Sequence, residues 1–585
     1  MPTVTFPLAY LQRLTQTPPQ QLAQQAFDYG LDATLHNQGL EVEVTAERPD
    51  LLAAEGFTRA INIYNGQPRN LTDDLGPSGR TLHVSANVTP LRPHIAALVV
   101  ENASLQAGGL EVLIQFQEKV TQTFGRQRKK IAIGVYDLDQ VTGDLYYTAL
   151  HQDELSFIPL QGHQPMTARQ ILADHPAGRL YRHTLPSGNL VPVLRDETST
   201  VLSMPPIING AGPGQVSADT QNLLIDVTGI QPQTVLDTLN ILAHNFLDTG
   251  AVVKTVVVRT EETSQVTPSL TPKAVPFSAK YLNEIMGSAI PKHALGKYLS
   301  RMDLHPTGTD VVLVPTYRTD ILSQVDLAGD LLVAIGIDTM RPDPTAVQFY
   351  TGKADVLKGF VAQVGDLAQR MGLMEVKSFI LTDPELMALF ADTENPGGVS
   401  NPVQIGNAKS RSFSTTRTTL QAGLLEILSR NINAPKPINI YETGEVLQLR
   451  WSRTDPKGPL HLPSPTDVNP ESLPTITETL YWGFASLDAR AAFSGAKSYV
   501  QTLLKALGVS YSLTECRAPY YLPGRAATVW IGDQPAGQFG EIHPRVLQHF
   551  SFPEPVCAGE LDCSAIMTAA QGAGGEGAMT SASII

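Results

Sequence analysis

Three aspartates stand close together in the segment YRTDILSQVDLAGD (317–330): Asp320, Asp326 and Asp330. The last two are four residues apart, so a helix would place them on one face, where like charges destabilise by about 0.2–0.5 kcal/mol. A cation such as Mg²⁺, which prefers hard oxygen ligands, could neutralise the group. Alternatively, Asp326 and Asp330 occupy the first turns of a helix, whose dipole favours anions, and Asp320 is a turn or cap residue. The residues alone leave both explanations open.

Familiar signatures of nucleotide binding and hydrolysis are missing from the chain. No G-x-x-x-x-G-K-[ST] loop occurs, no G-x-G-x-x-G follows a predicted strand, and neither H-E-x-x-H nor G-x-S-x-G is found. The three cysteines, Cys516, Cys557 and Cys563, form no C-x-x-C pattern, which argues against a zinc site. Local motifs therefore predict only a multidomain α+β protein without a visible ATP site.

Charge and composition narrow the possible partners. The 585-residue chain has a formal charge of −14, which argues against a general nucleic-acid binder because negative charge repels phosphate. One basic run, GRQRKK (125–130), is either a local RNA contact or a solvated turn before a strand. We find no apolar run of about 18 residues and no secretion signal, so neither a membrane span nor export is predicted. Few cysteines fit a cytoplasmic protein.

Apolar patterning predicts the elements that must position these residues. Runs of apolar and β-branched residues predict strands, and apolar residues recurring every three or four positions predict helices. Thr167 is the expected N-cap of a short helix, and Gly250 is expected to end a longer one that begins near 232. The clearest predicted strands are 92–104, 130–139, 222–229, 251–260, 310–317, 438–449 and 526–542.

Eight segments, taken in order, resemble the β subunits of phenylalanyl-tRNA synthetases of the shorter archaeal and eukaryotic type. The resemblance covers nearly the whole chain, roughly residues 1 to 565, and ordered agreement of many segments is more specific than any one motif. The segments are TAERPDLLAAEGFTRA (45–60), GRQRKKIAIGVYDLD (125–139), FIPL with MTARQILADHPAGRLY (157–181), VLSMPPIINGAG (201–212), LLIDVTG (223–229), PTYRTDILSQVDLAGDLLVAIGID (315–338), TRTTLQAGLLEILSRN (416–431) and GRAATVWIG with GEIHPRVL (524–547).

The resemblance implies a heterotetramer of two α and two β chains that acts on tRNA(Phe). In such an assembly the α chain holds ATP and attaches phenylalanine to the tRNA. The β chain carries a synthetase-like domain without catalytic motifs, which fits the missing ATP signatures here. It also carries an editing module that hydrolyses tyrosine mischarged onto the tRNA. Editing is needed because an apolar pocket rejects an added hydroxyl only about a hundredfold.

Residues for two sites follow from the resemblance. The family's small middle domain holds Mg²⁺ between acids, and Asp320, Asp326 and Asp330 match three of its four places, while Gly329 stands at the fourth. In the editing module, Asn209, Asp226 and Thr228 are the candidates for holding a water and recognising the tyrosyl hydroxyl. The alternative for these three is a turn packed on a strand.

The expected architecture is α+β and multidomain. It has an α+β editing module, a small helical or winged-type domain, and a class II synthetase-like antiparallel-sheet domain that lacks catalytic motifs and contacts the α subunit. The boundaries are 1–80 for an N-terminal α+β domain and linker, 81–265 for the editing module, 270–347 for the metal-binding domain, 350–568 for the synthetase-like domain, and 569–585 for a disordered tail.

Three functions remain in competition. The first is a working β subunit that supports aminoacylation and edits Tyr-tRNA. The second is a divergent paralogue that acts alone as an aminoacyl-tRNA hydrolase or a tRNA-dependent acyl transferase. Departures from the family's pattern at Glu47, Gly329 and Ala422 leave room for it. The third is an assembly or RNA-binding scaffold without chemistry.

Overall fold

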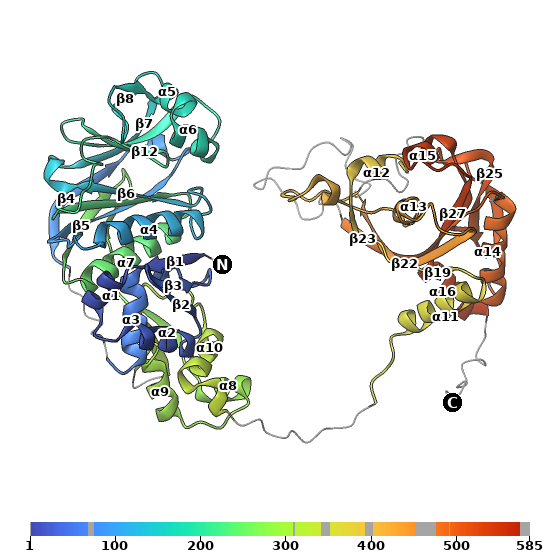
Figure 1. Ribbon diagram of the computed structural model, residues 1–585, viewed down its shortest axis with the longest axis horizontal. Helices are drawn as coiled ribbons and strands as arrows, with labels where there is room; N and C mark the ends of the chain where they lie inside the picture. Colours follow the sequence, from blue (N-terminus) through green and yellow to red (C-terminus); the bar gives the residue numbers. More distant parts are fainter. Residues whose placement is uncertain are drawn as a thin grey trace. The chain divides into compact units, whose positions relative to one another are not determined.

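The computed structural model describes residues 2–67, 69, 75–307, 310–340, 351–391, 402–450, 475–490 and 492–573. The chain divides into two compact units, Met1–Thr345 and Ala346–Ile585 (Figure 1). Most of the predicted tail lies outside the described residues, whereas its first residues belong to the last helix, which ends at Ala573. Among the described residues, no helix is long and apolar enough to cross a membrane.

The first unit opens with a small domain of three strands and three helices. The strand order is β1-β3-β2, and all pairs are antiparallel. Its core continues into that of the following domain, because one cluster of buried residues joins them. The elements are β1 (Thr3–Phe6), α1 (Leu8–Leu14), α2 (Pro19–Asp28), β2 (Asp32–His36), β3 (Gly39–Glu43) and α3 (Ala54–Tyr64).

The second domain is built on a ten-stranded sheet in the order β12-β11-β10-β7-β4-β14-β5-β13-β6, with β15 on β14. Its first strand begins at Pro77, before the predicted boundary at 81. A short pair, β8 (Ser156–Phe157) and β9 (Met166–Thr167), lies apart. The ten strands are β4 (Pro77–Val84), β5 (His94–Glu101), β6 (Ile131–Asp137), β7 (Leu145–His151), β10 (Leu190–Asp196), β11 (Val201–Met204), β12 (Ile208–Asn209), β13 (Leu223–Gly229), β14 (Val252–Arg259) and β15 (Ser264–Thr267).

The two ends of this sheet meet. Strands β12 and β6 are its outermost members, yet Asn209 Nδ2 of β12 lies 3.3 Å from the carbonyl oxygen of Val135 in β6. The Tyr136 hydroxyl oxygen of β6 also lies at hydrogen-bond distance, 2.8 Å, from Ser203 Oγ of β11. The sheet is therefore curled, and side chains from opposite ends of the strand order enclose one interior.

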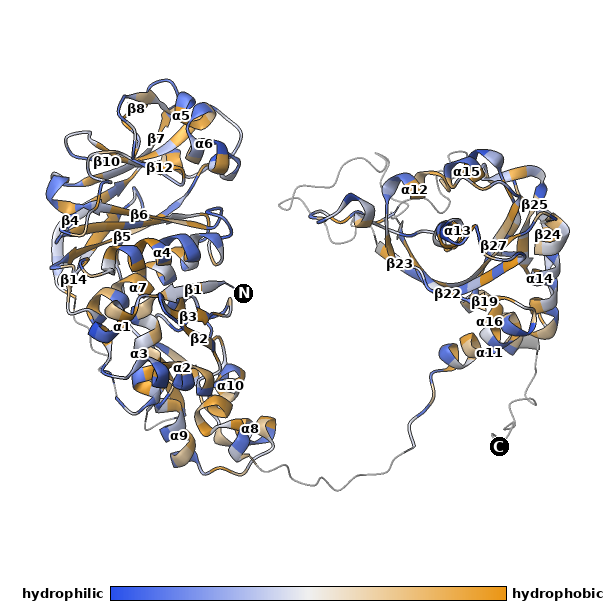
Figure 2. Ribbon diagram, in the orientation of Figure 1, coloured by the Kyte–Doolittle hydropathy of each residue, from blue (hydrophilic) through white to orange (hydrophobic). Residues whose placement is uncertain are grey.

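Alternation along the strands separates the two faces of the curled sheet. Residues with odd numbers in β6 and β13 face the large core that helices share, and the even-numbered residues face the interior. Figure 2 shows hydrophobic colour along β5 and β6 and both colours on the neighbouring helix α4. The helices are α4 (Gly109–Gln122), α5 (Ala168–Asp174), α6 (Pro176–Tyr181) and α7 (Pro232–Asp248).

The third domain of the first unit is small. Its sheet has the order β16-β18-β17, and three helices pack beside it. Asp326 and Asp330 lie on the last helix, as the four-residue spacing indicates. The elements are β16 (Lys273–Pro276), α8 (Ala279–Met286), α9 (Lys292–Ser300), β17 (His305–Pro306), β18 (Val311–Val314) and α10 (Gln324–Ile335).

The second unit is a seven-stranded sheet in the order β19-β22-β23-β27-β26-β25-β24 with separate apolar cores against its two faces. Helix α13 contributes to one core, and α11, α14 and α16 contribute to the other. All pairs except β19 with β22 are antiparallel, as predicted. The sheet strands are β19 (Met374–Glu375), β22 (Ile438–Arg450), β23 (Thr475–Leu487), β24 (Ser512–Glu515), β25 (Tyr521–Ile531), β26 (Gln534–Ile542) and β27 (Val556–Asp562).

The remaining elements of this unit include a separate two-stranded pair, β20 (Leu381–Thr382) with β21 (Thr415–Thr416). The helices are α11 (Val356–Arg370), α12 (Pro384–Ala388), α13 (Gln421–Arg430), α14 (Phe493–Ala506), α15 (Pro544–His549) and α16 (Cys563–Ala573). Ala422, where the sequence departs from the family pattern, is a buried residue of α13.

The structure confirms the helix ends and the strands predicted in the first unit. Thr167 caps α5 through a capping box with Gln170, and α7 ends just before Gly250, whose φ of 82° is the left-handed conformation that glycine favours. The strands predicted from 92–104, 130–139, 222–229 and 251–260 are β5, β6, β13 and β14.

Candidate functional site

A cavity of about 170 Å³ lies inside the curled sheet where its two ends meet. All three residues proposed for ester chemistry, Asn209, Asp226 and Thr228, line it. They come from β12 and β13, which stand at opposite ends of the strand order, so closure of the sheet brings them together. The other lining residues are Gln117, Arg128, Ala132, Ile133, Gly134, Tyr136, Leu160, Ala177, Ser203, Pro205, Pro206, Ile207 and Ile208.

Asp226 is the most deeply placed charge in the cavity wall, with only 2% of the residue exposed. Its Oδ1 accepts a hydrogen bond of 2.6 Å from the Tyr136 hydroxyl. The opposing residue in β6 is Gly134, and a Cβ there would stand 2.2 Å from Asp226 Oδ1 and 2.1 Å from the Tyr136 oxygen. A glycine at 134 is therefore needed for the carboxylate and the phenol to meet.

Burial raises the pKa of Asp226 to about 6, against the lowering influence of the Tyr136 hydrogen bond and the Arg92 charge. The carboxyl is mostly ionised at neutral pH and is protonated in mild acid. Burial, together with the neighbouring carboxylate, raises the pKa of Tyr136 well above its usual value, so this phenol remains a donor. The cavity thus presents a desolvated carboxylate whose Oδ2 accepts no hydrogen bond from the described part of the chain.

Thr228 is held by a buried arginine. Arg92 Nε donates to Thr228 Oγ1 at 2.9 Å and its Nη2 donates to the Thr228 carbonyl oxygen at 2.7 Å. Because Oγ1 accepts from Arg92, the hydroxyl proton of Thr228 remains available as a donor. Burial lowers the pKa of Arg92 to about 10, so the group is still charged at neutral pH.

Asn209 and Arg128 lie nearer the mouth. Asn209 is half-buried, and its Nδ2 is 3.3 Å from the carbonyl oxygen of Val135, which leaves Oδ1 as an acceptor. Arg128 Nη1 donates to the carbonyl oxygens of Pro206 and Ile207, at 3.2 and 3.1 Å. These bonds fasten the turn that carries the two prolines to the strand-end of β6.

Sequence reasoning missed Arg92, Tyr136 and Arg128, each of which shapes the site. Tyr136 lies in a predicted strand two positions from Gly134, and a glycine inside a strand often marks a close approach of another group. Arg128 belongs to the basic run, but nothing in its local sequence indicates that it reaches Pro206. Arg92 could be identified only from the fold, because its partner Thr228 is 136 residues away.

The lining set restricts the chemistry. It contains a carboxylate, hydroxyls, an amide and a guanidinium, but no histidine or cysteine among the described residues. Ser203 Oγ is hydrogen-bonded to the Tyr136 hydroxyl, and the set contains no histidine that could activate it. The wall is therefore suited to binding an aromatic or apolar group that ends in a hydroxyl, with water as the attacking nucleophile in any hydrolysis.

The three aspartates of the small domain do not converge on one point. Arg318 donates to both oxygens of Asp320, at 2.9 and 2.7 Å, and to Asp330 Oδ2 at 2.6 Å. Asp326 faces the backbone instead, where its Oδ2 accepts from the amides of Leu322 and Ser323 and completes the capping box of α10. The guanidinium of Arg318, with only 1% of its side chain exposed, stands between two of the carboxylates.

This arrangement does not fit a resident magnesium ion. Among the described residues, no group of three or more His, Cys, Asp or Glu side chains could hold a metal. The fourth position of the family pattern, Gly329, is open space, since a Cβ there would meet nothing within 4 Å. Although burial opposes it, the charge and hydrogen bonds of Arg318 lower the pKa of Asp320. The guanidinium supplies the positive charge that a metal would bring.

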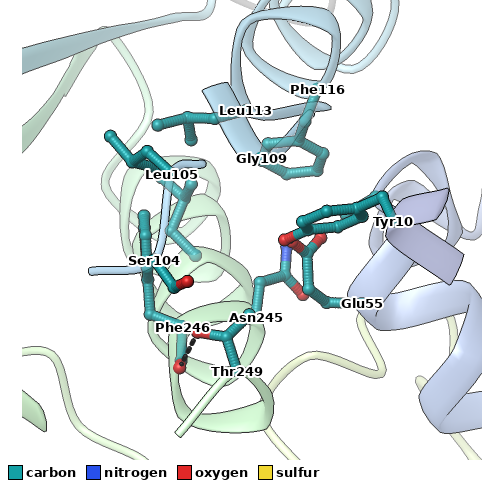
Figure 3. A pocket seen from close by; sticks show the side chains of 12 residues that line it. Tyr10, Glu55, Ser104, Leu105, Gly109, Leu113, Phe116, Asn245, Phe246 and Thr249 are labelled. Atoms are coloured by element: carbon teal, nitrogen blue, oxygen red, sulfur yellow. Dashed lines mark hydrogen bonds between the residues drawn. The ribbon is translucent and has the colours of Figure 1, made fainter. Parts of the chain in front are cut away.

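A second, smaller cavity of about 20 Å³ lies between α1, α3, α4 and α7 (Figure 3). The Tyr10 hydroxyl donates to the buried Glu55 carboxylate, and burial raises the pKa of that carboxyl. Asn245 Oδ1 has no hydrogen-bond partner in the described part of the chain. The volume suits about one water molecule, so the cavity is part of the polar packing between domains and no substrate site.

Comparison with known sequences and structures places these features in a family. Residues 275–337 match the family described as tRNA synthetase B5 domain, and residues 345–563 match Phenylalanyl tRNA synthetase beta chain CLM domain. The first unit is similar to the N-terminal fragment of the phenylalanyl-tRNA synthetase beta subunit from Pyrococcus horikoshii. That likeness has a TM-score of 0.55 and 29% identity, over 57% of this chain and 100% of that one. The chain is thus an aminoacyl-tRNA synthetase subunit.

Full-length relatives give the particular family. Phenylalanine–tRNA ligase beta subunits of Thermococcus sibiricus and Pyrococcus horikoshii are 32% and 31% identical, over 88% of this chain and 88% and 89% of theirs. That of Methanocella arvoryzae is 32% identical over 90% of this chain and 93% of its own. The chain belongs to the family of phenylalanine–tRNA ligase beta subunits and is a subunit of that class II enzyme.

The raised pKa of Asp226 predicts a pH dependence of stability. Because the folded value is about 6 and the ordinary value is 3.8, the native state binds the extra proton between them, and this stability contribution is lost as pH rises through that window. Asp226→Asn should remove about 3 kcal/mol of this change. Urea unfolding at pH 4 and pH 7 measures it, with Asp219→Asn, an exposed carboxylate, as control. An unaltered pH slope in Asp226→Asn would refute the prediction.

The arginine-filled acidic cluster predicts indifference to chelators. Dialysis against EDTA should leave the melting temperature of the full chain unchanged, and elemental analysis should find no stoichiometric Mg²⁺. Arg318→Met should destabilise by about 3–5 kcal/mol, because it leaves buried carboxylates unpaired. The control Arg430→Met, in an exposed pair with Glu426, should cost about 0.5 kcal/mol or less. Saturable stabilisation of the wild type by Mg²⁺ would contradict the geometry.

Proposed function

We propose that this chain is the β subunit of an assembly of two α and two β chains. The cavity inside its curled sheet hydrolyses tyrosine mischarged onto tRNA(Phe). The partner α chain performs the ATP-dependent attachment of phenylalanine to this tRNA. The observation that carries the editing part is the buried Asp226 carboxylate, which has a free oxygen facing a cavity in a chain of this family. The same cavity contains a hydroxyl donor at Thr228.

Selection of tyrosine follows from hydrogen bonding. The phenol of a tyrosyl group would donate to Asp226 Oδ2 and accept from Thr228. Phenylalanine offers neither bond, and it would leave the desolvated carboxylate without a partner, which is unfavourable. A site built to hydrogen-bond a substrate hydroxyl can discriminate by 10⁴–10⁵ against the analogue that lacks this hydroxyl. An apolar amino-acid pocket at the ligation site rejects the analogue with an added hydroxyl only about a hundredfold. The cavity would therefore supply the discrimination between tyrosine and phenylalanine that the ligation site lacks.

Hydrolysis of the ester then depends on a positioned water. The lining set described here has no activated serine, cysteine or histidine, so the nucleophile is water. Asn209 contributes Oδ1 as an acceptor for it, because its Nδ2 is already directed at Val135. Arg128 stands beside the same mouth and supplies positive charge near the position of the ester.

One observation favours the alternative of a stand-alone hydrolase. Every residue that lines the cavity lies between positions 117 and 228, inside the first unit, so no second chain is required to complete it. The two functions differ in a measurable way. A stand-alone hydrolase deacylates Tyr-tRNA at full rate without an α chain, whereas the proposed subunit charges tRNA(Phe) only when the α chain is present.

The partner surface is proposed on the second unit. Large apolar side chains are exposed around the β20–β21 pair, and Phe379, with 76% exposed, contacts Phe413 edge to face at a centroid distance of 5.7 Å. Ile405, Ile380 and Leu381 extend this exposed group. Arg417, which follows β21 directly, is itself buried against Glu442 at 2.7 Å, so it supports the fold of that region. A contiguous apolar surface of this kind fits a protein partner, which we assign to the α chain.

Editing is tested by deacylation of purified Tyr-tRNA(Phe) and Phe-tRNA(Phe). The wild type should hydrolyse the tyrosyl ester selectively. Asp226→Asn should reduce the ratio of the two rates by about 10- to 100-fold, the loss expected when a charged acceptor becomes neutral. Asp219→Asn, an equal charge change on the exposed surface, should leave the ratio unaltered. A tyrosine preference that survives Asp226→Asn would rule out this recognition.

Partner binding is tested by co-expression with an α chain and size measurement. Phe379→Asp should weaken the assembly at least tenfold while leaving the melting temperature of the isolated chain unchanged, because the side chain is exposed. Val356→Asp, at another exposed apolar side chain of the second unit, is the matched control and should assemble normally. Equal assembly by Phe379→Asp and wild type would show that the α chain binds elsewhere.

A further inference from the structure

The basic run at the start of β6 adopts an uncommon backbone conformation. Arg126, Gln127 and Arg128 are consecutive and all have positive φ, at 48°, 54° and 64°. Non-glycine residues rarely occupy this region even singly, and such strain concentrates at ligand-binding sites. Backbone bonds hold the turn, with the Gln127 amide donating to Gln122 and the Arg128 amide to Thr121, at 3.0 and 2.9 Å. The turn is thus a fixed structure that presents cations directly before a strand of the cavity wall.

A second basic segment faces the same cavity. Helix α6 contributes Ala177 to the lining, and Arg179, Arg182 and His183 follow it in exposed positions along α6 and the 3₁₀ turn Arg182–Thr184. No acidic residue occurs between 175 and 195, or between 125 and 136. Two stretches without a negative charge therefore occur in a chain whose formal charge is −14.

The two segments meet at Arg128. Its guanidinium lies 4.1 Å from the centroid of the Tyr181 ring, at the end of α6, and donates to the carbonyl oxygens of Pro206 and Ile207. Because Arg128 also lines the cavity, the contact places both segments beside the same mouth. Arg126 and Lys129, which flank Arg128 in the sequence, and Arg182, which follows Tyr181, are exposed. We call the exposed cations Arg126, Lys129, Arg179 and Arg182 the basic rim.

We propose that the basic rim binds the phosphates of a single-stranded RNA 3′ end, so that the terminal aminoacylated nucleoside enters the cavity. This rests on the proposed editing function, whose substrate is an ester at the end of a tRNA. An acidic chain repels a polyanion unless cations are gathered locally, and here exposed cations occur in the two segments that the contact of Arg128 with Tyr181 joins. Arginine beside an aromatic ring is also the combination that single-stranded nucleic acids contact through phosphate and base.

The experiment uses the full 585-residue chain and two variants, Arg126→Gln/Lys129→Gln and Arg182→Gln. Binding of labelled tRNA(Phe) is titrated at several salt concentrations. Each lost phosphate contact should reduce the slope of log K against log salt by about 0.7, the value for single strands, so the double variant should lose about 1.4 and bind about tenfold more weakly. The control Lys280→Gln/Lys297→Gln removes two positive charges from α8 and α9 and should bind like the wild type.

A second measurement separates the rim from the cavity. Tyrosyl-adenosine lacks phosphates, so its hydrolysis should be the same in wild type and rim variants, whereas the KM for Tyr-tRNA(Phe) should rise about tenfold in the variants. If the wild type hydrolyses neither substrate but the variants still lose RNA affinity and salt slope, the editing function fails and the rim stands. Unchanged RNA affinity and salt slope in both variants would overturn the proposal that the basic rim binds RNA. The proposal would also fail if the variants lost tyrosyl-adenosine hydrolysis as much as Tyr-tRNA(Phe) hydrolysis, because the turn would then only shape the cavity.

Discussion

Buried arginine–carboxylate pairing is the interaction on which the first unit depends. Arg59 of α3 pairs with Asp248 at the end of α7, and its guanidinium lies 3.9 Å from the ring centroid of Tyr317 in the small domain. One side chain thereby joins three domains that the sequence separates by nearly 260 residues. Arg48 approaches Asp320 of the small domain to within 3.9 Å in the same region. Removing one member of such a pair leaves an uncompensated buried charge, so the domains are stable mainly as a set.

Helix α7 connects this junction to the cavity. Its C-terminal end carries Asp248, and its N-terminal end follows β13 after a short turn, with Pro232 as the first helical residue. Asp226 and Thr228 lie on that strand, and the helix buries the face that packs against the sheet. The position of the cavity is therefore fixed by the same packing that holds the domains together.

The sequence predicted those features that depend on a local pattern of residues or on the order of the motifs. It identified the strands β5, β6, β13 and β14, the cap at Thr167 and the candidate residues that meet in the cavity, since each depends on nearby residues or on motif order. It could not predict the hydrogen-bond partners that come together only when the sheet closes. Tyr136 reaches Asp226 across 90 positions and Arg92 reaches Thr228 across 136, and no local pattern reports such contacts. Nor could it show that Arg318 donates to both Asp320 and Asp330.

Two aspartates of the first unit, Asp320 and Asp226, differ in how far the protein compensates their charge. Asp320 is buried beside a guanidinium that donates to both of its oxygens, and the charge and hydrogen bonds of Arg318 outweigh burial and lower its pKa. Asp226 is buried more deeply and receives one phenolic hydrogen bond and only a more distant arginine charge, so burial prevails and raises its pKa. A carboxylate whose charge is fully compensated holds domains together and has nothing left to offer a ligand. A carboxylate whose charge is only partly compensated, and which lines a cavity, is stabilised most by a ligand that donates a hydrogen bond to it. A tyrosyl hydroxyl is such a donor.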